Sequence, residues 1–521
     1  MNTTTKAIPA FIVSVVLVCT ISDAHSQDLS IEELQFGTNP SNSPLADFLS
    51  GIPGNSANDI SVGIALENLC GQIFGDSIPL VPQIFNTFDL CFGVVGPVLA
   101  ALDPKDKEFA QFVQESAGLL LGVSGQEVAA MAGSFTQLVP GGAISAQNRL
   151  STLRLAQAGS PTGRALAWDS HTGALTFDLE SGGGAGDDFD NRWRFYINGD
   201  ATTGRQDSTE LVEGYDLHGF SVNGGGDYRL ERNRFVGFNL ATDRVNLDYV
   251  GGSDGKVTTY DAAAYALLFR DNGWYMQGYA GLGSGKIDLS RSLRFRSRSS
   301  VITLSNGTTF LDLFSPIETI ETNFNSNTNA GRLFATVGAG RDFQRGPVNI
   351  GVSGSLDYLR VNVDGYTETT DDPRGDPLKL QIDDYNHRSL RFIAAADASR
   401  PISTSHGVVT PFVRGEWIHE FEDNPTEIRA RFAADPFSIG FVQNNLSYLG
   451  GAPAVNPQTG RPDPTTFVIT SDKPDTDYFQ LSTGASAALP QGVQAFVSLE
   501  ALVGLRNFER YTLHLGVSKE F

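Results

Sequence analysis

Charged residues are scarce in this sequence, and basic residues are in the minority. Charged residues make up 18% of the 521 residues, below the roughly 25% that is usual in soluble domains. The formal net charge is −22, which argues against a nucleic-acid partner, because phosphate binding needs a basic patch. The mean hydropathy is −0.13, so the chain is nevertheless not hydrophobic overall. This combination suits a chain in which apolar and polar residues alternate and average out.

The sequence also lacks a long apolar run. A helix needs about 20 apolar residues to cross a membrane, and the run from Ala7 to Cys19 is shorter. It follows Lys6 and precedes the small residues of Ala24-His25-Ser26, which is the pattern of a secretory signal peptide. We therefore expect residues 1–26 to be removed on export. Val18 stands where a lipid-modified cysteine needs a small neighbour, so a lipoprotein signal is disfavoured.

Cysteine and histidine are both rare. Removal of the signal peptide leaves only Cys70 and Cys91, and such a pair in an exported chain is a disulfide candidate. The alternative is two buried free thiols. No histidine lies between Gln27 and Ala146, so the sequence predicts neither a metal site nor any other cofactor.

The first part of the mature chain, residues 27–145, has the pattern of a small helical region. Apolar residues recur at helical spacing from about Asp59 onward. The segment Ser124-Gly125-Gln126-Glu127 has the pattern of a capping box and predicts a helix from Val128 to Phe135. A further amphipathic segment runs from Ala146 to Ala158, and helix breakers follow it as far as residue 190.

From residue 191 to residue 521 the period of the apolar residues changes to two, which is the signature of strands. About twelve strands of membrane-spanning length can be placed in this region. They lie near residues 192–200, 214–230, 233–250, 257–270, 273–292, 330–344, 346–366, 386–402, 407–421, 477–489, 492–506 and 509–521. The sequence therefore predicts an all-β fold, an antiparallel transmembrane β-barrel preceded by the small α-helical region.

The connections between these strands alternate in length. Short turns are expected at Glu231-Arg232-Asn233, Asp271-Asn272-Gly273, Arg345-Gly346, Ser403 to His406 and Pro490-Gln491-Gly492, and long loops near 293–329, 367–385 and 422–476. Outer-membrane barrels show this asymmetry, with short periplasmic turns and longer external loops. The alternation also gives an even number of strands, so the barrel can close without free edges. We therefore expect a barrel in the outer membrane of a Gram-negative bacterium.

The last strand has the features of a membrane-insertion signal. Its apolar residues share one face, its polar residues share the other, and the chain ends on an aromatic residue in phase with the apolar face. These residues are Tyr511, Leu513, Leu515, Val517 and Phe521. We expect this face to meet lipid and the edge of the strand to pair with the first strand.

The region from about residue 185 to residue 521 resembles the autotransporter β-domain, the translocator of type V secretion. The order and spacing of several segments carry the resemblance. They are Gly214-Tyr215-Asp216 through Gly226-Asp227-Tyr228-Arg229-Leu230, then Asp271-Asn272-Gly273-Trp274-Tyr275, the segment from Pro411 to Phe421, Asp475-Thr476-Asp477-Tyr478-Phe479, and Ala495-Phe496-Val497 through Gly504. Lys519 departs from the pattern, because the family usually has an aromatic or apolar residue there; a lysine can extend to the headgroups.

The resemblance implies a monomeric, twelve-stranded barrel with an α-helical linker through its pore. Here that linker would be residues 146–190, with the helix at Ala146 to Ala158 or nearby. The resemblance also implies a passenger, which in this chain would be short and atypical, because residues 27–145 contain no repeats. The implied partners are outer-membrane lipid, the barrel assembly machinery and periplasmic chaperones.

Two functions are compatible with these features. The first is a barrel that inserts into the outer membrane and translocates or displays its N-terminal region, without a catalytic group. The second is a surface-binding barrel or a narrow channel whose helical region stays in the periplasm.

Charged residues at period two are expected to face the lumen of the barrel. Three arginines share one face, and they could favour anions in the pore or pair with lumen carboxylates and carbonyl groups of the linker helix. A second set, Arg414 and Glu416, places a positive and a negative charge on one face of a strand. The expected lumen-facing residues are Arg294, Arg296, Arg298, Arg414, Glu416 and Glu500.

The segment Gly75-Asp76-Ser77 resembles the nucleophile block of lipolytic autotransporters. A serine esterase also needs a base for the hydroxyl and donors for the oxyanion. His171 lies beyond the linker helix, and no aspartate precedes it by three residues. An esterase is therefore a minor alternative, and we do not expect an enzyme.

Overall fold

The structure is a computed structural model that describes most of the chain from Arg192 onward and short parts of the region before it. The described residues are 57–59, 61–63, 65–66, 125–137, 150, 167–168, 175–176, 192–433 and 466–520, with gaps at 232, 271, 298–299, 304–308 and 313–317.

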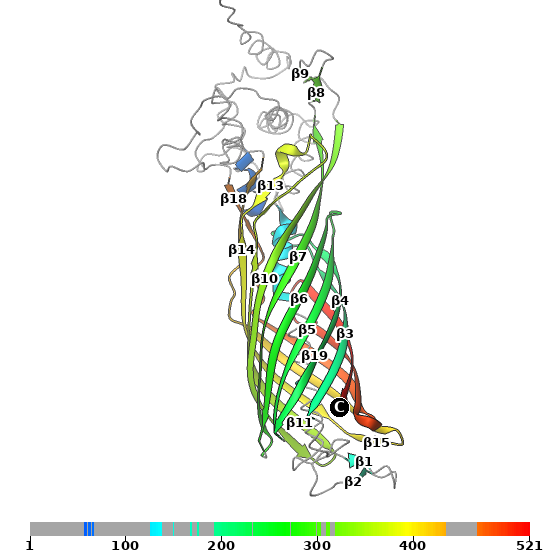
Figure 1. Ribbon diagram of the computed structural model, residues 1–521. Coiled ribbons are helices and arrows are strands. Elements are labelled where there is room, and N and C mark those ends of the chain that lie inside the picture. Colours follow the sequence, from blue (N-terminus) through cyan, green and yellow to red (C-terminus); the bar gives the residue numbers. More distant parts are fainter. Residues whose placement is uncertain are drawn as a thin grey trace, which may run out of the picture.

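Twelve long strands form a closed antiparallel barrel (Figure 1). Strand β21 pairs with strand β3 and closes the ring, and every other strand pairs with its neighbours in chain order. The strands are β3 (Trp193–Gln206), β4 (Tyr215–Glu231), β5 (Arg234–Tyr249), β6 (Asp254–Phe269), β7 (Trp274–Ser297), β10 (Glu318–Arg345), β11 (Val348–Val363), β14 (Tyr385–Ser399), β16 (Gly407–Glu420), β19 (Asp477–Ala488), β20 (Val493–Val503) and β21 (Phe508–Glu520). The predicted fold class and strand number are thus confirmed.

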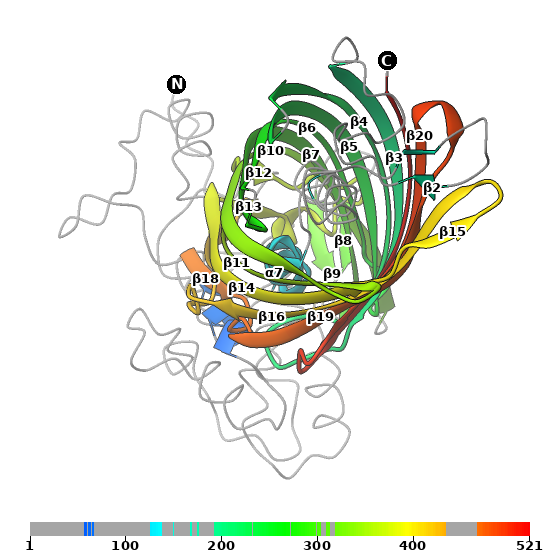
Figure 2. The ribbon, with the colours of Figure 1, turned by 90° about the horizontal axis from the view of Figure 1, so that it is seen from below.

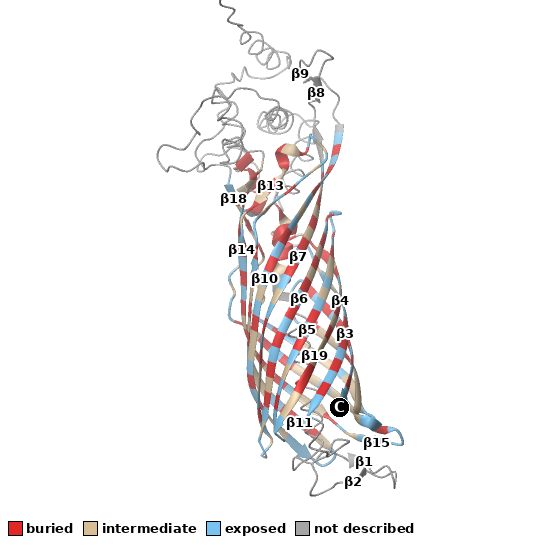
Figure 3. Cartoon of the chain, viewed as in Figure 1, coloured by how far each residue is buried: buried red, intermediate tan, exposed pale blue. Residues whose placement is uncertain are grey.

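Exposed and buried side chains alternate along these strands (Figure 3). On β7, for example, Met276 and Leu282 are 55% and 66% exposed, whereas Tyr275 and Tyr279 are 1% and 7% exposed. Because successive residues of a strand point to opposite faces, the buried set lines the inside of the barrel and the exposed apolar set forms its outer surface. An outer surface of this kind is suited to lipid.

Short turns connect the strands at one end of the barrel, where the C-terminal end also lies (Figure 1). Gly273 and Gly346 adopt φ values of 82° and 63° there, which glycine reaches without steric cost. Strand β15 (Ile402–Thr404) extends the turn before β16, and a 3-10 turn at Pro490–Gly492 joins β19 to β20. The predicted short turns are therefore present at the predicted places.

The long connections at the other end are partly folded. Strands β12 (Tyr366–Thr367), β13 (Leu380–Ile382), β17 (Glu427–Phe432) and β18 (Thr466–Thr470) form a four-stranded sheet, here called the mouth sheet. Strands β8 (Ser300–Thr303) and β9 (Thr309–Asp312) form a hairpin. The prediction of plain loops at 293–329, 367–385 and 422–476 was wrong in this respect, because β7 and β10 run on beyond the expected strand ends and the mouth sheet pairs segments far apart in sequence.

Two small elements precede the barrel in the chain. Helix α7 (Gln126–Gln137) lies inside the barrel wall (Figure 2) and covers the helix predicted from Val128 to Phe135. Strands β1 (Ala167–Trp168) and β2 (Leu175–Thr176) pair near the short-turn end (Figure 1). Of the predicted helix at residues 146–158, only Leu150 is described; it is helical and buried. None of the helices in the described ranges is long and apolar enough to cross a membrane.

Aromatic rings lie over glycines on the inner wall. A Cβ atom at Gly237 would overlap the ring of Tyr265, and one at Gly340 would overlap the ring of Tyr275. Glycine at these positions lets a large ring lie flat against the neighbouring strand.

Candidate functional site: the plugged lumen and its outer mouth

Helix α7 is narrow enough to fit within the barrel. Its sequence QEVAAMAGSFTQ is rich in alanine, glycine and serine, and the residues from Glu127 to Ala132 are all at most 4% exposed. The end of the Met131 side chain lies against Gly255 on the inner face of β6. Gly125, just before the helix, has φ +69°, and a Cβ atom there would lie 2.6 Å from Ile469 of the mouth sheet. The helix is therefore packed between the barrel wall and the mouth sheet.

Polar contacts hold the first turn of α7. The Tyr249 hydroxyl donates a 3.3 Å hydrogen bond to the carbonyl oxygen of Glu127, and the Ser253 hydroxyl donates a 3.0 Å bond to its carboxyl group. Both partners lie at the β5–β6 turn, on the long-connection end of the barrel. Burial raises the pKa of Glu127 from its ordinary value of 4.5 to about 7. The carboxyl group is therefore a buried, titratable contact of the plug.

Ion pairs link neighbouring strands across the inner wall. Arg332 bonds the carboxylates of Asp243, at 2.6 Å, and Asp261. A second group joins Arg510 to Glu500 at 3.0 Å and His514 Nδ1 to Asp200 Oδ1 at 2.6 Å. Charges in a low-dielectric interior need such partners. These pairs tie the wall together.

Three residues predicted to face the lumen do lie on the inner face of the strands. Arg414 donates a 2.6 Å bond to Glu416 and a 3.2 Å bond to Asp397. Glu500 accepts the bond from Arg510. The structure thus brings Arg414 and Glu416 together in one cluster and places Glu500 in another.

Arg294 does not face the lumen. Its side chain is 73% exposed and pairs at 3.1 Å with Glu321, on the face of β7 opposite to the buried Leu293. The prediction for Arg294 is therefore corrected. A period of two shows which residues share a face, but it does not show which face is inside, and this part of β7 lies beyond the predicted membrane-spanning strand. The side chain of Arg296 and all of Arg298 fall outside the described residues.

Arg291, three residues earlier on the same strand, was not predicted as a site residue. Its side chain is fully buried and makes 2.9 Å and 2.6 Å bonds to the Glu368 carboxylate. It also donates to the carbonyl oxygen of Leu378 at 3.0 Å and lies 4.2 Å from the ring centroid of Phe324. The signal in the sequence was an arginine in phase with the apolar residues Leu289 and Leu293.

The apolar residues of the last strand lie on the outer surface. Tyr511, Leu513, Leu515 and Val517 are between 40% and 51% exposed. The residues between them face inward, and β21 pairs with β3 along its whole length. Phe521 falls outside the described residues.

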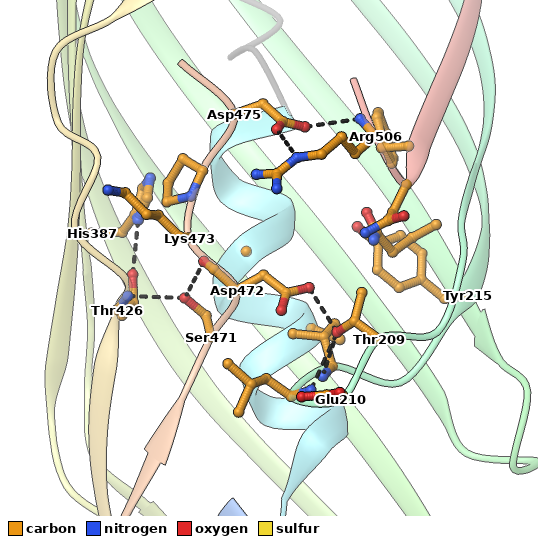
Figure 4. Close-up of a pocket in the computed structure, with 18 residues that line it drawn as sticks. Thr209, Glu210, Tyr215, His387, Thr426, Ser471, Asp472, Lys473, Asp475 and Arg506 are labelled. Carbon is orange, nitrogen blue, oxygen red and sulfur yellow. Dashed lines mark hydrogen bonds and ion pairs between the residues drawn. The ribbon is translucent and has the colours of Figure 1, made fainter. Parts of the chain in front are cut away.

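A pocket of about 430 Å³ opens between helix α7 and the barrel wall (Figure 4). It lies at the end of the barrel that carries the mouth sheet, here called the outer mouth. Ala130 and Gly133 of α7 form part of its lining. Polar contacts join the lining residues to one another: Arg506 donates a 2.5 Å bond to Asp475, Thr209 donates a 2.8 Å bond to Asp472, and His387 Nδ1 lies 3.1 Å from Thr426 Oγ1. Burial raises the pKa of Asp472. The residues come from six different segments, so the sequence alone does not reveal the pocket.

Asn58 and Ser61 of the N-terminal region contact the edge of the mouth sheet. The Asn58 amide accepts a 2.8 Å bond from the Thr470 amide group and donates bonds of 3.0 Å and 3.1 Å to the carbonyl oxygens of Thr470 and Leu211. Ser61 accepts a 3.2 Å bond from the backbone of Val468. Side chains of the N-terminal region therefore occupy the backbone groups of β18 that face away from β17.

Several predicted features fall outside the described residues. They are the signal peptide 1–26, Cys70, Cys91, Gly75-Asp76-Ser77 and His171. Each stays a prediction.

A family comparison and a structural comparison each return matches. Residues 195–451 match the model of the autotransporter β-domain. Among solved structures, the translocator domain of autotransporter NalP from Neisseria meningitidis is similar with a TM-score of 0.44 and 12% identity, over 63% of this chain and 89% of that chain. The β-domain of the Bordetella autotransporter BrkA has a TM-score of 0.38 and 13% identity, over 64% of this chain and 100% of that chain.

The transport unit of the autotransporter AIDA-I from Escherichia coli has a TM-score of 0.35 and 11% identity, over 72% of this chain and 98% of that chain. A search of curated proteins finds no match. The family match, rather than these structural likenesses, bears on function.

Proposed function

Because this chain belongs to the autotransporter family through its β-domain, we propose that its barrel carries the N-terminal region out through the outer membrane and keeps it displayed at the surface. Passenger translocation is the function of the family. A translocator barrel is not itself catalytic. Helix α7, near the end of this region, would then close the pore after the part of the chain before it has passed.

The observation that carries this proposal is the position of the N-terminal region at the long-connection end. Short turns of outer-membrane barrels face the periplasm and longer connections face outward. The first barrel strand, β3, begins at the short-turn end, yet α7, Asn58 and Ser61 contact the mouth sheet at the opposite end (Figure 1). The chain before β3 therefore reaches the outward end of the barrel, as translocation requires.

The contacts of the described residues between Asn58 and Leu66 support display rather than release. Val62, Ala65 and Leu66 are fully buried, and complete burial of a side chain such as valine or leucine contributes about 1.5–3 kcal/mol. The hydrogen bonds of Asn58 and Ser61 add about 0.5–1.5 kcal/mol each. Together these contacts favour a region that stays bound to the mouth sheet.

Protease treatment of intact cells tests the proposal. An epitope tag after Asp28, ahead of the residues that contact the mouth sheet, should be lost when protease is added to cells with an intact outer membrane. A matched tag in the periplasmic turn at Ser405 should be lost only after the membrane is opened. If both tags are protected until that point, translocation of the N-terminal region is disproved.

The second function, a surface-binding barrel or narrow channel, is favoured by the pocket beside α7. It would place recognition in the folded mouth, and a protected N-terminal tag would support it.

Export and assembly belong to the same proposal. Residues 1–26 would direct export, and Cys70 and Cys91 would form a disulfide outside the cytoplasm. Tyr511, Leu513, Leu515, Val517 and Phe521 would form the insertion signal that the barrel assembly machinery reads, after delivery by periplasmic chaperones. The folded protein would be a monomeric barrel in a Gram-negative outer membrane.

A further inference from the structure

Three carboxyl groups and one guanidinium group surround the first turn of helix α7. Arg291 is bonded to both oxygens of Glu368 and to the carbonyl oxygen of Leu378. The backbone amide of Leu380 also donates to Glu368, at 2.8 Å. The Arg291–Glu368 pair thus joins the barrel wall to the mouth sheet, and it leaves the carboxyl groups of Glu127 and Glu213 as a second, separate pair.

The carboxyl groups of Glu127 and Glu213 are both bonded to the short turn between β5 and β6, which brings them together. Glu127 belongs to α7 and is 4% exposed, whereas Glu213 is half-buried in the β3–β4 connection. Ser253 donates to Glu127 at 3.0 Å, and the backbone amide of Gly251 donates to Glu213 at 2.5 Å. Two buried carboxylates held against one turn repel each other, so the arrangement is favoured while the two groups share one proton.

The groups that face this pair come from every element packed around it. Tyr249 of β5 and Tyr215 of β4 are buried nearby, and Tyr366 of β12 is partly buried. Arg291 of β7 is the cation that acts on Glu127, and it is already bonded to Glu368. The surroundings are therefore mainly neutral hydroxyl groups and acids, which stabilise the pair only in its singly protonated form.

We propose that the Glu127–Glu213 pair is a proton-operated latch that holds the plug helix in the outer mouth of the barrel, and that loss of the shared proton loosens the helix. Glu213 is fixed to the wall, since it lies in the connection between two barrel strands. Glu127 moves with the helix. Repulsion between the two charges therefore acts directly on the contact between plug and barrel.

The direction of the pH effect follows from the difference between the docked and free helix. Burial raises the pKa of Glu127 from 4.5 to about 7, so the docked helix binds the proton more tightly than the free helix does. Docking is therefore strongest at low pH and weakens as the pH rises from about 4.5 to about 7. Above that range both forms have lost the proton, and docking changes no further.

Conductance of the mature full-length chain in planar bilayers tests the latch. We expect the fraction of time in the high-conductance state to rise at least about tenfold between pH 5 and pH 7.5, because each pH unit within the window changes docking by up to about tenfold. Glu127→Gln and Glu213→Gln keep a hydrogen-bonding partner without a titratable proton. Each should reduce the change to less than about twofold. Glu321→Gln, a matched change at an exposed carboxyl group outside the mouth, should keep the full change.

A second measurement follows the helix itself. Ser134 is fully buried on α7, so Ser134→Cys in a background without Cys70 and Cys91 reports exposure of the helix to a thiol reagent. The reference is Ser405→Cys, a thiol in an exposed turn. The reaction rate of the α7 thiol, divided by that of the reference thiol, should rise over the same pH window. When Glu213→Gln is added, this ratio should not change with pH. The latch is disproved if both readouts are independent of pH in the unaltered pair, or if the two glutamine variants keep the full pH dependence. Neither result depends on whether the N-terminal region is displayed outside the cell.

Discussion

The barrel wall and the outer mouth are built by different kinds of contact. In the wall, strands pair with their neighbours in chain order, apart from the closing pair of β21 with β3. In the mouth, contacts join distant segments, as Asn58 does with Thr470 and Arg291 with Glu368. The wall therefore depends on a repeated pattern that many residues share, whereas the mouth depends on individual contacts between segments far apart in the sequence.

The largest effect should come from breaking the buried ion pair of the mouth. Arg291→Met leaves the Glu368 carboxylate buried without its cation, and removing one partner of such a pair costs about 3–5 kcal/mol. We expect the mouth to lose order while the barrel stays closed. Limited proteolysis should show new cleavage near residues 366–382. The folded barrel should still migrate differently on a gel before and after heating.

The double variant Arg291→Met with Glu368→Leu is the control for this prediction. It removes both charges, so most of the protease resistance should return. Equal sensitivity in the single and the double variant would show that the charge left behind is not the cause.

A smaller effect is expected from a charge on the outer surface of the wall. Leu515 is 51% exposed on the lipid-facing side of β21, and an arginine facing lipid near the bilayer midplane costs about 2–4 kcal/mol. Leu515→Arg should lower the midpoint of urea unfolding in lipid vesicles and reduce the folded fraction. Leu515→Ala keeps the surface apolar and should change the midpoint far less; a similar loss in both variants would contradict the assignment of this face to lipid.

The contrast between wall and mouth also explains how much the sequence revealed. Alternation is local, so it predicted the twelve strands, the short turns and the outward face of Tyr511 to Val517. The mouth sheet pairs Leu380 with Phe432 and Ile428 with Ile469, and no local pattern indicates such pairing. The long expected loops therefore concealed a folded sheet.

The lumen was predictable only in part. The capping box located helix α7, but its alanines and glycine give no clear apolar face, and the position of the helix against Gly255 depends on the closed barrel. The inward direction of Arg414 and Glu416 followed from alternation with Val413 and Trp417, which are exposed. The arginine run on β7 lacked such a guide, because a strand that leaves the membrane no longer needs an apolar outer face.

The smallest effect is expected from a substitution of Arg294, which lies on the same strand as Arg291. Arg294 and Arg291 lie three residues apart on β7, and each pairs with a glutamate, but the pair of Arg294 with Glu321 has 73% and 68% of its side-chain surfaces exposed. Water screens an exposed pair, and ordering two long side chains offsets most of its attraction, so such pairs contribute about 0–1 kcal/mol. Arg294→Ala should therefore leave the urea midpoint and the protease pattern of the mouth unchanged, in the same assays that detect Arg291→Met. If Arg294→Ala lost as much protease resistance as Arg291→Met, a partner would have to cover the outer face of β7 around Arg294. Only removal of water could give the exposed pair so large a contribution.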